Sequence, residues 1–262
     1  MKSLQGSLWA AILFCFGAVA ASAQYQPGAL YSVMPERTKA LALAADGSAM
    51  TVAASESDRP DRYWTLTELS GSWRLINPFS NLALRAEGDA VVSGENNGSD
   101  EAQLWRLEPV GSNGAVRMVP VNRPDVAAAV QGSGIVLVPK ARGTRFTVNP
   151  ARKAGFSPEL TYRFRSVAHP DMVIGNGDNG ENNTVIRIES VDDSNRGQYW
   201  NVKMLDLDNR VIAGAFYDQN FDDGGSNASI NHLLQWPATE GVWKNACFRF
   251  EPVGSIPGQY VI

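Results

Sequence analysis

The sequence predicts an all-β protein made of repeated units that close into threefold barrels. The first observation is a regular spacing of aromatic residues, since 41 residues separate Trp64 from Trp105 and Trp105 from Phe146. The second is a repeated segment, because the eight residues 105–112 recur in closely similar form at 248–255. The third is the pattern between these points, which consists of short apolar strands and turn residues without helical periodicity.

Each unit opens with a short apolar strand and ends with an aromatic residue. The openings lie at 30–33, 72–76, 115–119 and 161–164, and the ends lie at 62–64, 103–105, 144–146, 198–200 and 246–248. Two further strands are predicted inside the units, at 82–86 and 135–138. Gly, Asn, Asp and Pro separate these segments, which is typical of strands joined by turns.

The chain divides into an export signal and two domains. Residues 1–23 have a basic start, an apolar stretch and a small-x-small end, so we expect cleavage before Gln24. Prolines and glycines interrupt the strand pattern between 149 and 160, so residues 24–150 and 151–262 are predicted as separate domains. The second domain looks truncated, because 258–262 resembles only the opening strand of a sixth unit. Three alternatives could complete this domain: packing against the first domain, a partner protein chain, or a divergent closure of the barrel.

Composition excludes several classes of partner. The full chain carries 23 basic and 27 acidic residues, and loss of the signal makes the balance one charge more negative. Scattered basic residues on an acidic chain argue against nucleic acid, which needs clustered Lys and Arg. No later segment has the roughly 20 apolar residues of a membrane span. We therefore expect a soluble protein without membrane insertion, either secreted, periplasmic or at the cell surface.

Cys247 is the only cysteine left after the signal, so a disulfide within one chain and a cysteine-based zinc site are excluded. With small and apolar neighbours, its thiol is expected to be a buried apolar group rather than a nucleophile.

Two segments match a Gln-x-Trp motif: Gln103-Leu104-Trp105 and Gln198-Tyr199-Trp200. Together with the spacing, they make residues 29–253 resemble the ricin-B-like lectins. That resemblance implies β-trefoil domains, one complete at the N-terminus and a second that is divergent or incomplete. The motif has a structural reason, because the indole fills the barrel core and the Gln ties neighbouring loops. The closing aromatics Trp64, Trp105, Phe146, Trp200 and Phe248 are therefore expected in the core.

The resemblance also implies a carbohydrate site in the fifth unit. In family members an aromatic residue lies nine positions before an Asn that directly precedes the motif, and Trp236 and Asn245 keep that spacing ahead of 246–248. Gln235 and His232 lie beside the ring in sequence and are expected to add hydrogen bonds. A sugar site needs such an aromatic platform beside polar groups that fix orientation.

The essential carboxylate of the family maps to the loop before this aromatic, where Asp218 and Asp222 are the two candidates. Two departures stand against the site: Leu234 occupies a position that is often polar, and the strand at 211–214 lacks an Asp. The alternative interpretation makes Trp236 a core residue and Asn245 a turn residue.

Other functions find less support. Units one, two and four lack the platform and the amide, so we expect no sugar there. Residues 218–229 resemble a calcium loop but have Asp223 and Ser229 where Gly and Glu are required, so neither a metal nor a cofactor is predicted. The only histidines, His169 and His232, have no nucleophile in a recognisable motif, and we expect no enzyme activity. The predicted function is glycan or polysaccharide binding, and the alternative is a targeting or scaffold subunit that binds a protein.

Overall fold

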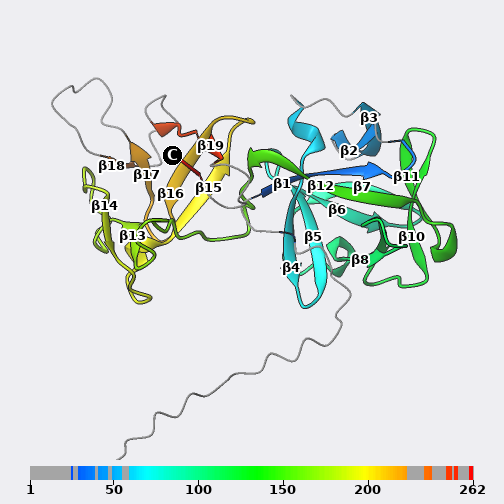
Figure 1. The fold of residues 1–262 in the computed structure, drawn as a ribbon, viewed down its shortest axis with the longest axis horizontal. Coiled ribbons are helices and arrows are strands. Elements are labelled where there is room, and N and C mark those ends of the chain that lie inside the picture. Colours follow the sequence, from blue (N-terminus) through cyan, green and yellow to red (C-terminus); the bar gives the residue numbers. More distant parts are fainter. Residues whose placement is uncertain are drawn as a thin grey trace, which may run out of the picture.

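The computed structural model describes residues 25, 29–38, 41–46, 49–54, 59–222, 233–237, 246–249, 251–252 and 260–261. These residues form two β-rich lobes that lie side by side, with β1–β12 in one and β13–β20 in the other (Figure 1). No helix among them is both long and apolar enough to cross a membrane.

The first lobe consists of three units of four strands each. They are β1(Ala29–Pro35), β2(Leu41–Asp46), β3(Ala49–Ala54) and β4(Thr65–Leu69); β5(Ser72–Asn77), β6(Leu82–Glu87), β7(Ala90–Glu95) and β8(Trp105–Pro109); and β9(Val116–Pro120), β10(Val126–Gln131), β11(Gly134–Pro139) and β12(Arg145–Ala154). A short 3-10 helix precedes the fourth strand of each unit: η1(Pro60–Arg62), η2(Glu101–Gln103) and η3(Lys140–Arg142).

Six of these strands close a barrel. The pairs β1–β12, β12–β9, β9–β8, β8–β5 and β5–β4 follow one another around it, and Tyr31 bridges to Trp64 to join β4 back to β1. The other six strands form the hairpins β2–β3, β6–β7 and β10–β11, whose strands β3, β7 and β11 pair with each other. A six-stranded barrel capped by three mutually paired hairpins is a β-trefoil, so the predicted all-β trefoil fold is confirmed.

Glycines shape two of the hairpins. Gly88 (φ +55°) and Gly132 (φ +63°) each take the first position of a two-residue turn, between β6 and β7 and between β10 and β11. Glycine adopts this left-handed conformation without steric cost, and two-residue hairpin turns favour it.

The closing aromatics lie in the core as predicted. Trp64, Trp105, Phe146 and Trp200 have no exposed surface, whereas Phe248 is half-buried against the core of the second lobe. The indole N–H of Trp105 donates to the carbonyl of Leu84 at 2.9 Å, and those of Trp64 and Trp200 also donate to backbone carbonyls. Each buried indole therefore has its polar group satisfied.

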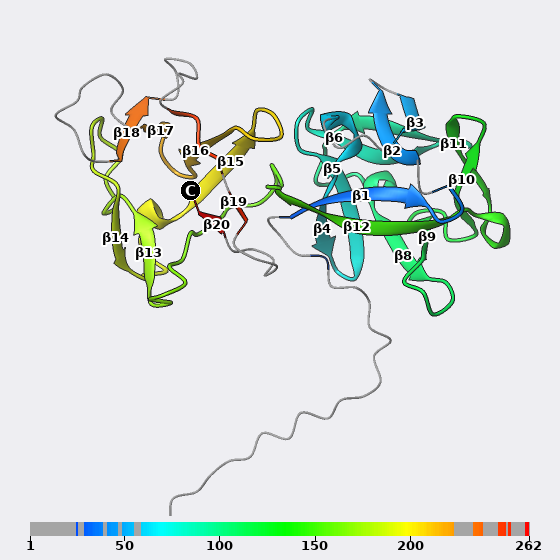
Figure 2. The same ribbon diagram turned by 45° about the horizontal axis from the view of Figure 1, so that its top comes forward.

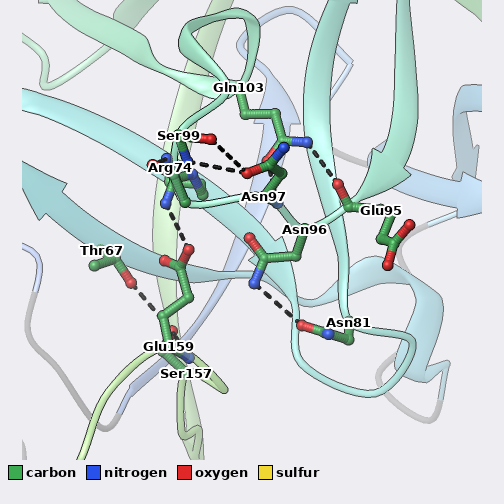
Figure 3. Close-up of polar contacts among 11 residues, drawn as sticks. Thr67, Arg74, Asn81, Glu95, Asn96, Asn97, Ser99, Gln103, Ser157 and Glu159 are labelled. Atoms are coloured by element: carbon green, nitrogen blue, oxygen red, sulfur yellow. Dashed lines mark hydrogen bonds and ion pairs between the residues drawn. The ribbon is translucent and has the colours of Figure 1, made fainter.

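The glutamine of each motif holds a loop: Gln103 holds the loop before η2, and Gln198 holds the loop before η4(Arg196–Gln198). The amide group of Gln103 donates to the carbonyl of Glu95 (2.7 Å), and its oxygen accepts from the backbone N–H of Asn97 (3.0 Å), as Figure 3 shows in part. Gln198 makes the same two contacts, with the residues six and eight positions before it, at 2.9 and 2.7 Å. Both side chains are buried, so the motif is structural in both lobes.

The second lobe repeats this plan for two units. It contains β13(Met172–Gly175), β14(Arg187–Ser190), η4(Arg196–Gln198), β15(Trp200–Met204), β16(Arg210–Gly214), β17(Gln219–Asp222), β18(Leu234–Pro237), β19(Glu251–Pro252) and β20(Tyr260–Val261). Tyr162 bridges to Trp200 as Tyr31 does to Trp64, and Arg210 bridges to Phe248 in the same way. The described strands thus give two trefoil units followed by one further strand, β20, paired with β19.

The two lobes are in contact through β12 and share part of a core. β12 continues to Ala154, so the predicted boundary between residues 150 and 151 falls inside it, and β12 contacts β19 of the second lobe (Figure 2). Leu30 and Tyr63 of the first lobe pack in one cluster with Phe156 and Trp200. The first trefoil therefore covers part of the core of the second lobe.

Polar contacts reinforce the same junction. The guanidinium of Arg74, on β5, donates to the Glu159 carboxylate at 2.5 Å and to the carbonyl of Gly98 at 2.8 Å. The hydroxyls of Thr67 and Ser157 lie 3.1 Å apart (Figure 3). Because the Arg74 side chain is only 2% exposed, this ion pair is largely shielded from water.

Candidate functional site

The predicted carbohydrate site falls on the β17–β18 hairpin of the fifth unit. In this hairpin Asn220 lies opposite Trp236, and Phe221 lies opposite Gln235. The segment 183–186 lies alongside β18, because Gln235 exchanges backbone hydrogen bonds with Asn183 and Thr184 at 2.9 and 3.0 Å and Val185 forms a β-bridge with Leu234. The fourth unit therefore supports the hairpin along its outer edge.

Amide side chains fix the loop 176–182 against this hairpin. The Gln235 oxygen accepts from Asn176 Nδ2, and Gln235 Nε2 donates to the carbonyl of Asn179, both at 2.8 Å. Gln219 Nε2 donates to Asn182 Oδ1 at 3.0 Å. Gln235 and Asn176 are fully buried, so these bonds form away from competing water. The hairpin and the loop are thereby held in one arrangement.

The predicted site residues are placed as follows. Asp218 is exposed and directly precedes β17, while Asp222 ends the strand and is only 6% exposed. The backbone of Trp236 belongs to β18 and lies opposite Asn220 of β17. Asp218 and Asp222 are each two residues from Asn220 along the chain. His232 and Asn245 lie outside the described residues. The hairpin thus brings Asp218, Asp222 and Trp236 into one supersecondary element.

Gln235 has a different place from the expected one. It was predicted to hydrogen-bond a sugar, but its side chain has no exposed surface and both of its polar groups are bonded inside the protein. In this arrangement it positions the hairpin. Of the two candidate carboxylates, the exposed Asp218 is the one that a ligand can reach from solvent.

Sequence reasoning missed a group of side chains next to this hairpin. Phe216, in the loop between β16 and β17, is 58% exposed, and its ring lies edge-on to that of Tyr199 with the centroids 6.1 Å apart. The guanidinium of Arg196 lies 5.9 Å from the Phe216 centroid. An aromatic pair in a loop of otherwise small and polar residues was the available signal, since the family spacing does not include this loop.

The neighbouring tyrosine is fixed by a carboxylate. Tyr217 donates its hydroxyl hydrogen to Asp178 Oδ1 at 2.6 Å, and this bond raises the pKa of Tyr217 above its usual value. On the other side of the group, the Arg163 guanidinium lies 4.3 Å from the Tyr199 ring centroid and pairs with Asp193 at 2.7 Å.

The described residues include no group of three His, Cys, Asp or Glu side chains arranged to hold a metal ion. Cys247 is half-buried, and burial, followed by the charge of Asp206, raises the pKa of its thiol. A raised pKa lowers the fraction of reactive thiolate, as expected for an apolar role of this residue.

No protein-family model matches the chain, and no curated protein matches its sequence. Among solved structures, a mosquitocidal holotoxin is 14% identical with a TM-score of 0.44, over 86% of this chain and 29% of the toxin chain. A ricin B-like lectin from Macrolepiota procera, in complex with lactose, is 15% identical with a TM-score of 0.42, over 49% and 99%. The Haemophilus ducreyi cytolethal distending toxin is 15% identical with a TM-score of 0.41, over 46% and 83%. The trefoil assignment rests on the strand pairing described above.

Proposed function

We propose that this chain is an exported lectin of the ricin-B-like type, which binds a glycan or polysaccharide through its fifth unit without catalysing a reaction. One observation carries the proposal: the β17–β18 hairpin places the exposed Asp218 and the strand position of Trp236 on an element that buried amides hold rigid. Sugar recognition requires an aromatic surface and a few polar groups in fixed positions, and prior rigidity lowers the entropic cost of binding.

The proposed roles combine the family spacing with the burial of the described residues. The Trp236 indole supplies the apolar platform, and Asp218 accepts hydrogen bonds from sugar hydroxyls. Asn245, at the position that the family spacing implies, and His232, near Trp236 in sequence, complete the polar contacts. Gln235 and Asp222 are buried and support the hairpin from inside the protein. Loss of either the platform or the carboxylate removes on the order of 1–2 kcal/mol of binding free energy, which corresponds to roughly tenfold in affinity.

The test uses the purified full chain on an array of neutral and acidic glycans, followed by calorimetric titration of the best ligand. Trp236→Ala and Asp218→Asn are expected to weaken binding about tenfold. Leu69→Ala and Asp125→Asn change exposed residues of the first lobe and serve as matched controls. Absence of binding to every glycan, or equal weakening by the controls, would refute the proposal.

Two further parts of the proposal have their own measurements. Export predicts that protein recovered outside the cytoplasm begins at Gln24, which N-terminal sequencing detects. Binding without catalysis predicts that mass spectrometry finds the bound glycan unchanged after long incubation. Shortened glycan that depends on the protein would identify an enzyme instead.

A further inference from the structure

Phe216 is held in an exposed position by its neighbours. The backbone N–H of Ala215 donates to the carbonyl of Tyr199 at 2.9 Å, and the next residue, Tyr217, is anchored to Asp178. The Tyr217 ring also lies so close to Gly180 that a Cβ there would come within 2.4 Å of it. A single exposed apolar side chain is ordinary, but this ring is fixed at the end of a rigid hairpin.

The groups around the ring include a guanidinium available to a ligand. Arg196 has the ring contact with Phe216 and no ion pair among the described residues, whereas Arg163 is paired with Asp193. Asp178 keeps one carboxylate oxygen that does not bond Tyr217. An exposed ring flanked by a guanidinium and a carboxylate offers C–H stacking together with donors and acceptors for hydroxyl groups.

The charges of the side chains around Phe216 favour one class of sugar. Of the groups that a ligand at Phe216 would meet, Arg196 and Asp178 carry opposite charges, and Arg163 is already paired with Asp193. A neutral pyranose needs no charge compensation and matches the mixed donors and acceptors.

The position of the ring connects it with the hairpin site. Phe216 precedes Gln219 by three residues, and Gln219 lies opposite Pro237, which directly follows Trp236. A backbone hydrogen bond from Gln219 to Tyr217, 2.8 Å long, keeps this short connection compact. Phe216 therefore lies in the chain next to the end of the β17–β18 hairpin at which the backbone of Trp236 is placed.

We propose that Phe216, with Arg196 and Asp178, forms a second subsite that binds another neutral pyranose of the same glycan. This inference rests on the proposed function of the fifth unit and extends it: the preferred ligand is a neutral oligosaccharide, and its affinity rises with chain length. The sugar at the Trp236 subsite binds in the absence of the second one.

The experiment compares a monosaccharide with neutral oligosaccharides of increasing length, titrated into the full chain by calorimetry. Phe216→Ala is expected to remove most of the gain that the oligosaccharides show, about five- to tenfold, and to leave monosaccharide affinity unchanged. Phe216→Tyr keeps the ring and is expected to retain the gain. Val167→Ala changes another exposed apolar side chain of this lobe, 66% exposed, and is the matched control.

The outcomes separate the two proposals. If Trp236→Ala abolishes monosaccharide binding but Phe216→Ala binds oligosaccharides like the wild type, the second subsite is wrong and the proposed function stands. If no glycan binds, both are wrong. A preference for acidic oligosaccharides, or a loss in Phe216→Ala of a protein contact instead of a glycan contact, would also overturn the subsite. Circular dichroism confirms that each variant remains folded.

Discussion

Leu30 tests whether the first trefoil supports the second lobe. Its neighbours Ala29, Tyr31 and Val33 face the core of the first barrel, so strand alternation directs Leu30 outward from that barrel. It is nevertheless fully buried, because it packs in the cluster of the second lobe. The substitution Leu30→Ala therefore removes apolar contacts that join the lobes and leaves the first core intact.

The expected cost follows from burial. Truncation of a fully buried Leu to Ala costs about 2–5 kcal/mol, depending on how far the cavity collapses. Gly155 packs tightly against Leu30, since a Cβ at Gly155 would lie 2.4 Å from the Leu30 side chain, so truncation of Leu30 opens a cavity beside this backbone. We expect about 3 kcal/mol, equivalent to a fall in Tm of roughly 6–12 °C for a unit of this size.

The assay is denaturant unfolding combined with hydrogen exchange. Exchange is expected to accelerate at 200–214 in the second lobe and to change little at 82–95 in the first. Leu69→Ala, at a residue 37% exposed, should cost less than about 0.5 kcal/mol. A loss below about 1 kcal/mol for Leu30→Ala, with unchanged exchange at 200–214, would refute the shared core.

Three other measurements examine separate contacts. Gln198→Ala removes the buried partner of two backbone groups, at Asp192 and Ser190, and the loss of two hydrogen bonds should lower the free energy of unfolding by about 1–3 kcal/mol; an unchanged unfolding midpoint would contradict this. Glu159→Gln leaves Arg74 buried without its counter-charge and should cost about 3–5 kcal/mol; wild-type stability would mean that water reaches the guanidinium. Burial, and then the nearby Tyr31, raise the pKa of Tyr25 to about 12, so its stabilising contribution is complete below pH 10 and lost as the pH rises toward 12. Ultraviolet titration against Tyr25→Phe measures this pKa, and ionisation near pH 10 would exclude the buried phenol.

The trefoil units could be predicted from sequence because their signals are local. The even spacing of Trp64, Trp105 and Phe146 reflects one buried ring per unit, and Gln103 and Gln198 mark the loops that they hold. Each of these residues has the same surroundings in its own unit. A pattern that repeats along the chain therefore repeats in space.

The remaining features depend on contacts between distant segments. The sequence around Leu30 does not indicate that this outward-facing side chain is buried. Phe156 and other residues of the second lobe bury it, and they are distant from Leu30 in the chain. The interior place of Gln235 follows from Asn176 and Asn179, more than fifty residues earlier in the chain. The role of the loop that holds Phe216 depends on Arg196 and Tyr199 of the preceding unit.

The ten-residue length of β12 affects how this protein can be divided. The strand pairs with β1 at both of its ends, from Phe146 opposite Pro35 to Ala154 opposite Ala29, and only Gly155 separates it from the buried Phe156. Cutting the gene after residue 150 would leave four residues of a paired strand on the wrong fragment and would uncover apolar surface on both. Recombinant halves and limited proteolysis should therefore treat the two lobes as one piece.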